Sequence, residues 1–237
     1  MKKYVNLFVF VFMVGACFSQ GKAQTKSAVS YKNPVVDIAM PDPTVIKATD
    51  GYFYVYATES TRNVPIMKSK DLVEWTYCNT AFTNKTRPRF EPKAGIWAPD
   101  INYINGKYVL YYAMSVWGGE QTCGIGVATA DSPQGPFTDH GKMFRSNEIG
   151  VQNSIDPSLL QYEGRNYLVW GSFRGIYVIE LTADGLSIMP GAKKKRIAGT
   201  AFEAVYIHKH GDYYYMFASI GSCCQGVKST YTVSYTH

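Results

Sequence analysis

The sequence is poor in charged residues and lacks the patterns typical of several protein classes. Asp, Glu, Lys and Arg make up only 18% of its 237 residues. No basic run interleaves with aromatic residues, and the one basic cluster, 193–196, has the composition of a solvated loop, so nucleic-acid binding is not indicated. No apolar run is long enough to cross a bilayer as a helix, and convincing helical stretches are absent after the first two dozen residues.

Cysteine is scarce as well. After the N-terminal segment, Cys78, Cys123, Cys223 and Cys224 remain, without the Cys-x-x-Cys or His spacings that build a zinc site. Disulfides are permissible in an exported protein. The adjacent Cys223 and Cys224 are compatible with a vicinal disulfide or with two buried thiols, and the sequence leaves both interpretations open.

The first 24 residues have the composition of an export signal. Lys2 and Lys3 precede the apolar run 7–14, and small residues follow that run. Residues 21–23 suit ordinary signal peptidase, whereas the segment ending at Cys17 resembles a lipoprotein signal with Cys17 lipidated. A core helix is disfavoured because no polar face has helical period. We therefore predict a periplasmic, outer-membrane or secreted protein with one domain over 25–237.

Aromatic residues are abundant, at 15% of the chain with 19 Tyr. A protein that binds neutral sugars would show this bias, because the apolar faces of sugar rings stack on aromatic side chains. A β-rich fold would show it too, because Tyr, Phe and Trp favour strands. The second explanation accounts for most of these residues.

A glycine followed by a dense aromatic strand occurs four times along the chain. The copies begin at Gly51, Gly106, Gly164 and Gly211, at intervals of 55, 58 and 47 residues. A period near fifty, built from short strands and turns, is typical of propeller blades. The sequence therefore predicts an all-β propeller with about four blades; the alternative is a β-sandwich whose strands are similar by chance.

Each copy also has an acidic residue six to nine positions before its glycine: Asp42, Asp100, Asp156 and Glu203. A further short strand follows the first three copies, at 66–69, 125–128 and 176–179. In a propeller, the first strand of every blade lines the central channel. The repeat therefore predicts that the four carboxylates point toward one shared site.

Carboxylates crowded around one site repel each other, so some of them keep a proton near neutral pH. One protonated and one ionised carboxyl group are what glycoside hydrolysis requires, as general acid and general base. A calcium site also collects oxygen ligands, but no loop here has the closely spaced alternate acids of a calcium-binding loop. The pattern favours a glycosidase.

Eight segments extend this pattern over almost the whole chain after the signal, from Pro34 to Tyr231. They are Pro41–Pro43, Ser69–Trp75, Trp97–Asp100, Ser132–Phe137, Asn153–Pro157, Gly171–Ile176, Glu203–Ala204 and Cys223–Gly226. In order and content they resemble glycoside hydrolase family 43, whose members are five-bladed β-propeller enzymes, and especially its endo-1,5-α-L-arabinanases.

The resemblance implies a role for three of the acids. Asp42 corresponds to the general base, Glu203 to the general acid, and Asp156 to the group that orients Glu203 and raises its pKa. Asp100 has no catalytic counterpart, so a structural carboxylate that accepts hydrogen bonds from strand or loop amides is the preferred interpretation.

The resemblance also implies substrate contacts. Trp97 is either a stacking platform for a sugar ring or a buried core indole, and Asn153, Ser172 and Phe173 are expected to line the same cleft. The implied activity is inverting hydrolysis of plant cell-wall polysaccharide, with arabinan as the substrate and no cofactor required for the chemistry. The alternatives are a β-xylosidase or α-L-arabinofuranosidase of the same family, and a carbohydrate-binding propeller without catalysis.

The sequence departs from the family pattern at two places. Val205 follows Glu203-Ala204 where the family usually has proline. The chain ends at His237, after the fourth repeat, whereas family members continue into a fifth blade that carries a histidine near the channel, often beside a structural metal ion. We therefore expect a C-terminally truncated propeller without that histidine, a polysaccharide as its partner, and contact with a membrane only through a lipid anchor at Cys17.

Overall fold

The computed structural model describes residues 30–222 and 231–236. The proposed signal 1–24, with Cys17, and the pair Cys223 and Cys224 lie outside these residues, so the predictions about them stand untested. The described residues from Lys32 onward form one compact unit. No helix in the described part of the chain is long and apolar enough to cross a membrane.

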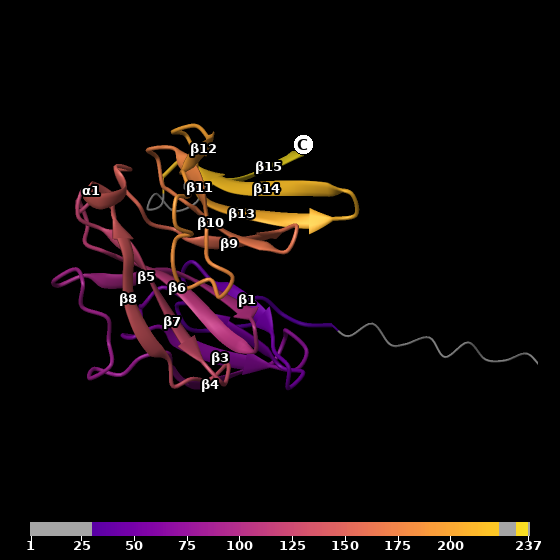
Figure 1. The fold of residues 1–237 in the computed structure, drawn as a ribbon. Coiled ribbons are helices and arrows are strands. Elements are labelled where there is room, and N and C mark those ends of the chain that lie inside the picture. Colours follow the sequence, from indigo (N-terminus) through magenta and orange to yellow (C-terminus); the bar gives the residue numbers. More distant parts are fainter. Residues whose placement is uncertain (1–29, 223–230, 237) are drawn as a thin grey trace, which may run out of the picture. The chain divides into compact units, whose positions relative to one another are not determined.

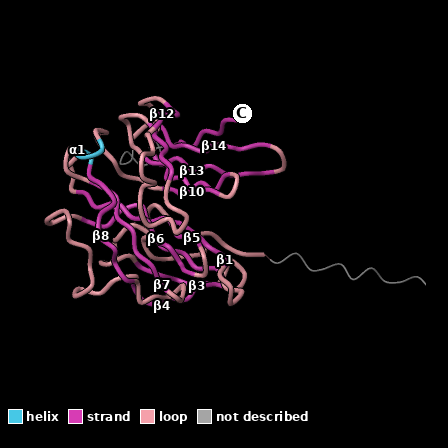
Figure 2. The backbone as a smooth tube through the Cα atoms, in the orientation of Figure 1, coloured by secondary structure: helices cyan, strands magenta, loops and turns pink. Residues whose placement is uncertain are grey.

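The described residues form four consecutive antiparallel β-sheets (Figure 1), and the short α1 (Ser146–Ile149) is the one α-helix among them (Figure 2). The first sheet contains β1 (Thr44–Lys47), β2 (Phe53–Tyr56), β3 (Pro65–Ser69) and β4 (Trp75–Thr80). The second contains β5 (Gly95–Ile104), β6 (Lys107–Ser115), β7 (Gly124–Ala130) and β8 (Thr138–Arg145). The third contains β9 (Ser158–Tyr162), β10 (Arg165–Trp170), β11 (Ile176–Glu180) and β12 (Lys195–Ala198). The fourth contains β13 (Glu203–His210), β14 (Tyr213–Ile220) and β15 (Tyr231–Thr236).

Within each sheet, strands that are adjacent in sequence pair with each other, as in a propeller blade. The first strands of successive sheets are also neighbours: β1 contacts β5, β5 contacts β9, and β9 contacts β13. This order confirms the prediction of an all-β propeller with about four blades.

The aromatic repeat strands are the second strand of each sheet. Gly51, Gly106, Gly164 and Gly211 lie in the turns that precede them, with φ of 85, 84, 72 and 58°. Positive φ is accessible to glycine at little cost, which explains why each aromatic strand begins just after a glycine.

Both faces of the repeat strand β6 are buried between sheets, and successive side chains of a strand point to opposite faces. In β6, Leu110 and Tyr112 pack toward the first sheet, whereas Val109 and Tyr111 pack toward the third. A smaller cluster around Val169 and Val205 joins the third and fourth sheets. These apolar layers hold the first strands in fixed positions.

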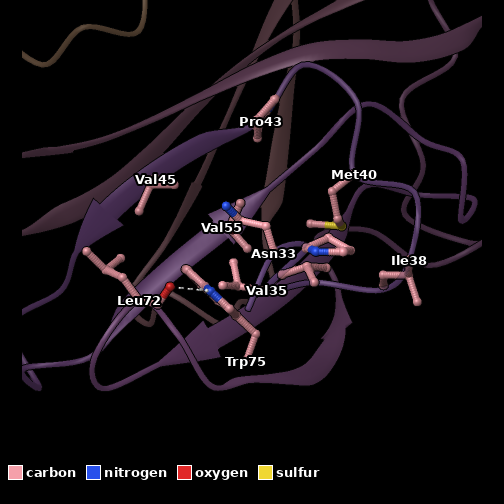
Figure 3. A pocket seen from close by; sticks show the side chains of 11 residues that line it. Asn33, Val35, Ile38, Met40, Pro43, Val45, Val55, Leu72 and Trp75 are labelled. Atoms are coloured by element: carbon pink, nitrogen blue, oxygen red, sulfur yellow. Dashed lines mark hydrogen bonds between the residues drawn. The ribbon is translucent and has the colours of Figure 1, made fainter. Parts of the chain in front are cut away.

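A hollow lies on the outer face of the first sheet and not among the acidic residues. It has a volume of about 760 Å³ and is lined by apolar side chains of β1 and β2, by the segment 33–40, and by Leu72 and Trp75 (Figure 3). The Trp75 indole N–H donates a hydrogen bond to the Leu72 carbonyl at 3.0 Å across its rim. No carboxylate lines this hollow, so the chemistry must be sought elsewhere.

Candidate active site

In each of the four sheets the backbone bends just before the first strand or near its start. The bend residues are Asp42, Ala98, Asp156 and Ala204, with φ of 48, 42, 56 and 49°. Left-handed backbone is costly for residues other than glycine and is tolerated where the surrounding structure enforces it, often at functional sites. The bends recur at the same place in each sheet and therefore provide a common register for the acidic residues.

In this register the four acids are not equivalent. Asp42 and Asp156 are themselves bend residues, and Glu203 directly precedes the bend at Ala204, whereas Asp100 follows the bend at Ala98 by two residues. The repeat-based prediction that all four carboxylates share one site is therefore wrong for Asp100. The spacing to the next glycine carried this signal, because Asp100 lies six residues before its glycine whereas the other three acids lie eight or nine residues before theirs. The shift moves the side chain into different surroundings.

Asp42, Asp156 and Glu203 come close enough to influence each other's ionisation, and we call them the carboxylate cluster. The pKa of Asp156 is raised to about 8, first by burial of its carboxyl group and then by the charges of Glu203 and Asp42. The N–H of Ala204 donates a hydrogen bond to this carboxyl group and acts in the opposite direction. Asp156 is therefore protonated at neutral pH and is held against the backbone next to Glu203.

Glu203 also has a raised pKa. Burial is the largest cause, and the negative charge of Asp42 adds to it. The Ser172 hydroxyl donates a hydrogen bond to Glu203 Oε2 at 3.1 Å and favours the ionised form, which limits the increase. The carboxylate that raises the pKa of Glu203 in this geometry is thus Asp42, since Asp156 keeps its proton to higher pH.

Asp42 is the most exposed member of the cluster. Its Oδ2 accepts a hydrogen bond of 2.5 Å from the Thr58 hydroxyl, whose oxygen in turn accepts one of 2.7 Å from the N–H of Ala98. The N–H of Thr58 donates to the Pro41 carbonyl at 2.9 Å. Thr58 therefore fixes Asp42 relative to the first and second sheets.

Three residues predicted to line the cleft are connected to Glu203. Asn153 Nδ2 donates to the Ser172 carbonyl at 3.0 Å, and Ser172 forms a β-bridge with Glu203. The N–H of Phe173 donates to the carbonyl of Phe202, the residue before Glu203, at 2.9 Å. Asn153, Ser172 and Phe173 thus belong to one structure around the acid.

Trp97 combines the two interpretations offered for it. It is partly buried and packs on Ile155, next to Asp156, and on Cys123. The centroid of its ring lies 5.5 Å from that of Trp117, which is 79% exposed. An exposed indole beside a half-buried one forms an aromatic surface close to the carboxylate cluster.

Asp100 lies in a different environment, between sheets. Its side chain is buried, and it accepts hydrogen bonds from the Leu159 N–H at 2.8 Å, from Asn102 Nδ2 at 2.7 Å and, weakly, from the Thr44 hydroxyl at 3.5 Å. This matches the structural interpretation of Asp100, in which a carboxylate receives strand amides.

The residue two positions after a bend links neighbouring sheets in three successive cases. The links are Ile101 N–H to Thr44 Oγ1 at 3.3 Å, Leu159 N–H to Asp100 Oδ2 at 2.8 Å, and Ser158 Oγ to the Val205 carbonyl at 2.6 Å. A polar side chain at this position therefore joins consecutive sheets.

Within residues 30–222 and 231–236, no three His, Cys, Asp or Glu side chains are arranged to hold a metal ion. The structural metal that the resemblance suggested stays a prediction, and the chemistry below is derived from the carboxyl groups.

The comparison with known families matches this arrangement over the whole described chain. The family model described as "Glycosyl hydrolases family 43" matches residues 31–237. The chain belongs to glycosyl hydrolase family 43. The four sheets described above therefore belong to a family 43 domain.

Relatives within family 43 include enzymes named for arabinan. The extracellular endo-α-(1→5)-L-arabinanase 1 of Bacillus subtilis is 36% identical over 208 residues, which are 82% of this chain and 63% of the relative. The arabinan endo-1,5-α-L-arabinosidase A of Aspergillus niger is 32% identical over 192 residues, covering 77% of this chain and 59% of the relative. The chain thus spans about three fifths of the length of these relatives.

Solved structures of family 43 have the same fold. The α-L-arabinanase of Cellvibrio cellulosa superposes with a TM-score of 0.74 at 28% identity, over 84% of this chain and 71% of that one. The native Bacillus subtilis arabinanase gives a TM-score of 0.72 at 33% identity, over 84% and 72%. These neighbours are five-bladed propellers, and the four sheets described here form the larger part of such a propeller.

Sequence reasoning missed two residues of the site. Thr58 lies seven residues after Gly51, just beyond β2, at the position where the other copies have Ala113, Gly171 and Ala218. A hydroxyl among three small residues was a usable signal. Trp117 lies in a loop outside the repeat, and no spacing identified it.

Proposed function

We propose that this chain hydrolyses α-1,5-linked arabinan with inversion of configuration. The observation that carries the proposal is the asymmetry of the carboxylate cluster: Glu203 is partly buried with a raised pKa, whereas Asp42 is exposed and accepts a hydrogen bond. One carboxyl group that keeps its proton and one that offers an ionised oxygen are the two groups that glycoside hydrolysis requires.

Glu203 acts as general acid in this proposal. Its proton passes to the glycosidic oxygen as the bond to the anomeric carbon breaks, so the leaving sugar departs as a neutral alcohol. The Ser172 hydroxyl, 3.1 Å from Oε2, stabilises the carboxylate that remains.

Asp42 acts as general base. It accepts a proton from a water molecule while that water attacks the anomeric carbon from the face opposite the leaving group. Inversion requires room for this water, so we expect about 6.5–9.5 Å between the carboxyl groups of Asp42 and Glu203. Exchange of protons with solvent then restores both groups.

Asp156 acts as a positioning residue. Its carboxyl group accepts a hydrogen bond from the Ala204 N–H. Asp156 thereby fixes the start of the strand that carries the acid.

The sugar chain is held by the surroundings of the cluster. Trp97 and Trp117 offer an aromatic surface on which the apolar faces of furanose rings stack, and Asn153, Ser172 and Phe173 border the acid. The choice of arabinan rests on the relatives named for it, together with the Cellvibrio cellulosa arabinanase solved in complex with arabinohexaose.

The test is sugar release from linear arabinan, followed by proton NMR of the first products. We expect the β-anomer to appear before mutarotation, because inversion at an α-linked furanose produces it. Arabinoxylan and nitrophenyl pentosides form the comparison panel. Faster cleavage of a xyloside than of arabinan would show that arabinan is not the preferred substrate. An α-anomer as the first product would exclude inversion. Binding of the sugar without its release would indicate a carbohydrate-binding propeller without catalysis.

We further propose that the protein is exported and requires no cofactor for this reaction. The N-terminal composition of residues 1–24 supports export, as does the name of the Bacillus subtilis relative, which is extracellular. Cell fractionation, together with mass spectrometry of the mature N-terminus, distinguishes a lipidated Cys17 from cleavage after residue 23.

A further inference from the structure

A second hollow, which the mechanism does not use, opens near the start of β5. It has a volume of about 400 Å³ and is bordered by Arg62, Arg87, Arg89, Lys93 and Glu91. Arg62 comes from the connection between β2 and β3, and the others come from the connection between β4 and β5. We call it the basic hollow.

The charges in the basic hollow do not balance. Arg87 is paired with Glu59 at 2.5 Å, both side chains being buried, and Glu91 is paired with Arg145 at 2.9 Å. In the described part of the chain, no carboxylate lies within 4 Å of the side-chain nitrogens of the remaining three cations, which are Arg62, Arg89 and Lys93. The hollow therefore has an excess of three positive charges.

Two of these cations are held in place by one asparagine. Asn84 Oδ1 accepts hydrogen bonds from Arg62 Nε at 3.2 Å and from Asn63 Nδ2 at 3.1 Å, and the Asn84 carbonyl accepts one from Arg89 Nη2 at 3.0 Å. Asn63 in turn accepts from Arg87 Nη1 at 3.1 Å. A guanidinium has five N–H donors, so each exposed arginine is oriented and still has donors available for a ligand.

The basic hollow is next to the candidate active site along the chain. Lys93 and Ala94 border it, and Trp97 follows three residues after Ala94 in the extended β5, at most about 10–11 Å away. Glu59, the residue after Thr58, accepts a hydrogen bond from the Ile96 N–H at 3.0 Å and joins the two regions rigidly. A saccharide chain bound at the carboxylate cluster is thus within reach of the basic hollow.

We propose that the basic hollow binds the carboxylate of a uronic acid residue in the saccharide chain that occupies the neighbouring site. The inference rests on the proposed function, because it assumes that a saccharide chain occupies the neighbouring site. Arginine presents paired N–H donors that match a carboxylate, which favours this ligand over a neutral sugar. The chain would then recognise acidic regions of its substrate as well as the neutral arabinose residues that it cleaves.

The test measures binding of trigalacturonate at low salt by calorimetry, with its methyl ester as the uncharged analogue. We expect the triple variant Arg62→Gln/Arg89→Gln/Lys93→Gln to bind trigalacturonate at least about tenfold more weakly, because three partly exposed cations each contribute modestly. Lys85→Gln is the matched control: Lys85 is exposed on the same connection and does not border the hollow. It should bind as the wild type does, and the methyl ester should not bind.

The proposal would be overturned if the triple variant bound trigalacturonate as tightly as the wild type does, or if the methyl ester bound as tightly as trigalacturonate. It would also be overturned if inorganic phosphate, at the concentration of trigalacturonate, competed fully, because the hollow would then be a site for small anions. Thermal unfolding of each variant verifies that it is folded. Binding needs no catalysis, so a wild type that binds trigalacturonate but does not cleave arabinan would refute the proposed function alone.

Discussion

Asp156 and Asp100 belong to adjacent sheets, and their surroundings differ. Asp156 is the bend residue of the third sheet, whereas Asp100 lies two residues after the bend of the second sheet. Asp100 receives hydrogen bonds from three side-chain or backbone donors and lies between sheets. Asp156 receives one from the Ala204 N–H and lies beside two other carboxyl groups. Burial raises the pKa of both, to about 6 for Asp100 and about 8 for Asp156.

The difference indicates which buried acid serves structure and which serves chemistry. Donors supplied around Asp100 offset much of the cost of burial and join three sheets. At Asp156 the neighbouring charges add to that cost, and such an arrangement persists where it has a functional use. An acid at the bend residue joins the carboxylate cluster, whereas an acid two residues after the bend lies between sheets and accepts their hydrogen bonds.

The largest expected effect is a difference in kcat between a variant of the carboxylate cluster and a variant of Asp100. Glu203→Gln should lower kcat on arabinan by about 10³-fold, because the amide cannot protonate the leaving oxygen. Asp100→Ala, measured at low temperature on folded protein, should stay within about threefold of the wild type. Glu74→Gln, an exposed change in the first sheet, is the control. A similar loss in Glu203→Gln and Asp100→Ala would remove the distinction.

The next effect concerns Asp156 and the pH dependence of the rate. Asp156→Asn should lower kcat by about 10²-fold and leave the alkaline limb of the pH profile in place. The reason is that Asp156 stays uncharged up to about pH 8, as asparagine does, so the pKa of Glu203 remains set by burial and by the charge of Asp42. An alkaline limb that moves to lower pH in stopped assays from pH 4 to 10 would contradict a role of Asp156 in positioning alone.

The two acids should also affect stability in opposite directions. The pKa of Asp156 rises from an ordinary 3.8 to about 8 on folding, so the folded state binds the proton more tightly and its stability decreases as pH rises from about 4 to about 8. Asp156→Asn should therefore unfold at higher temperature than the wild type at pH 8, with the difference vanishing near pH 4.

Asp100→Ala provides the contrasting stability measurement. It leaves the buried Leu159 N–H without its acceptor and should lower the free energy of unfolding by about 1–3 kcal/mol at pH 7. Urea unfolding of both variants at pH 4, 7 and 8 tests the pair. If Asp156→Asn were less stable than the wild type at pH 8, as Asp100→Ala is expected to be, the proposed difference between the two acids would be wrong.

The smallest expected effect concerns the hydrogen bond that holds Asp42. Thr58→Val removes the donor to Asp42 Oδ2 while keeping the shape, and should lower kcat by about tenfold with little change in KM. Thr58→Ser, which keeps the hydroxyl, should restore kcat. Failure of serine to do so would indicate a packing role for Thr58.

Much of the fold could be predicted from local sequence. The glycines at 51, 106, 164 and 211 locate the turns, and the apolar and aromatic residues after them form β2, β6, β10 and β14. Turn chemistry and strand propensity act over a few residues, so the repeat was visible in the sequence. The grouping of Asp42, Asp156 and Glu203 followed from the resemblance and from their shared place at the entry to each sheet.

The sequence by itself determined the type and order of the strands, the period of the sheets and the residues that could perform acid–base chemistry. Only the tertiary structure decided that Asp100 lies between sheets, that Thr58 holds Asp42, that Trp117 joins Trp97 and that three unpaired cations line one hollow. These outcomes depend on bends that shift a side chain by one or two positions, and on contacts between residues 16 to 59 positions apart. No local propensity encodes such contacts, because packing of whole sheets against one another creates them.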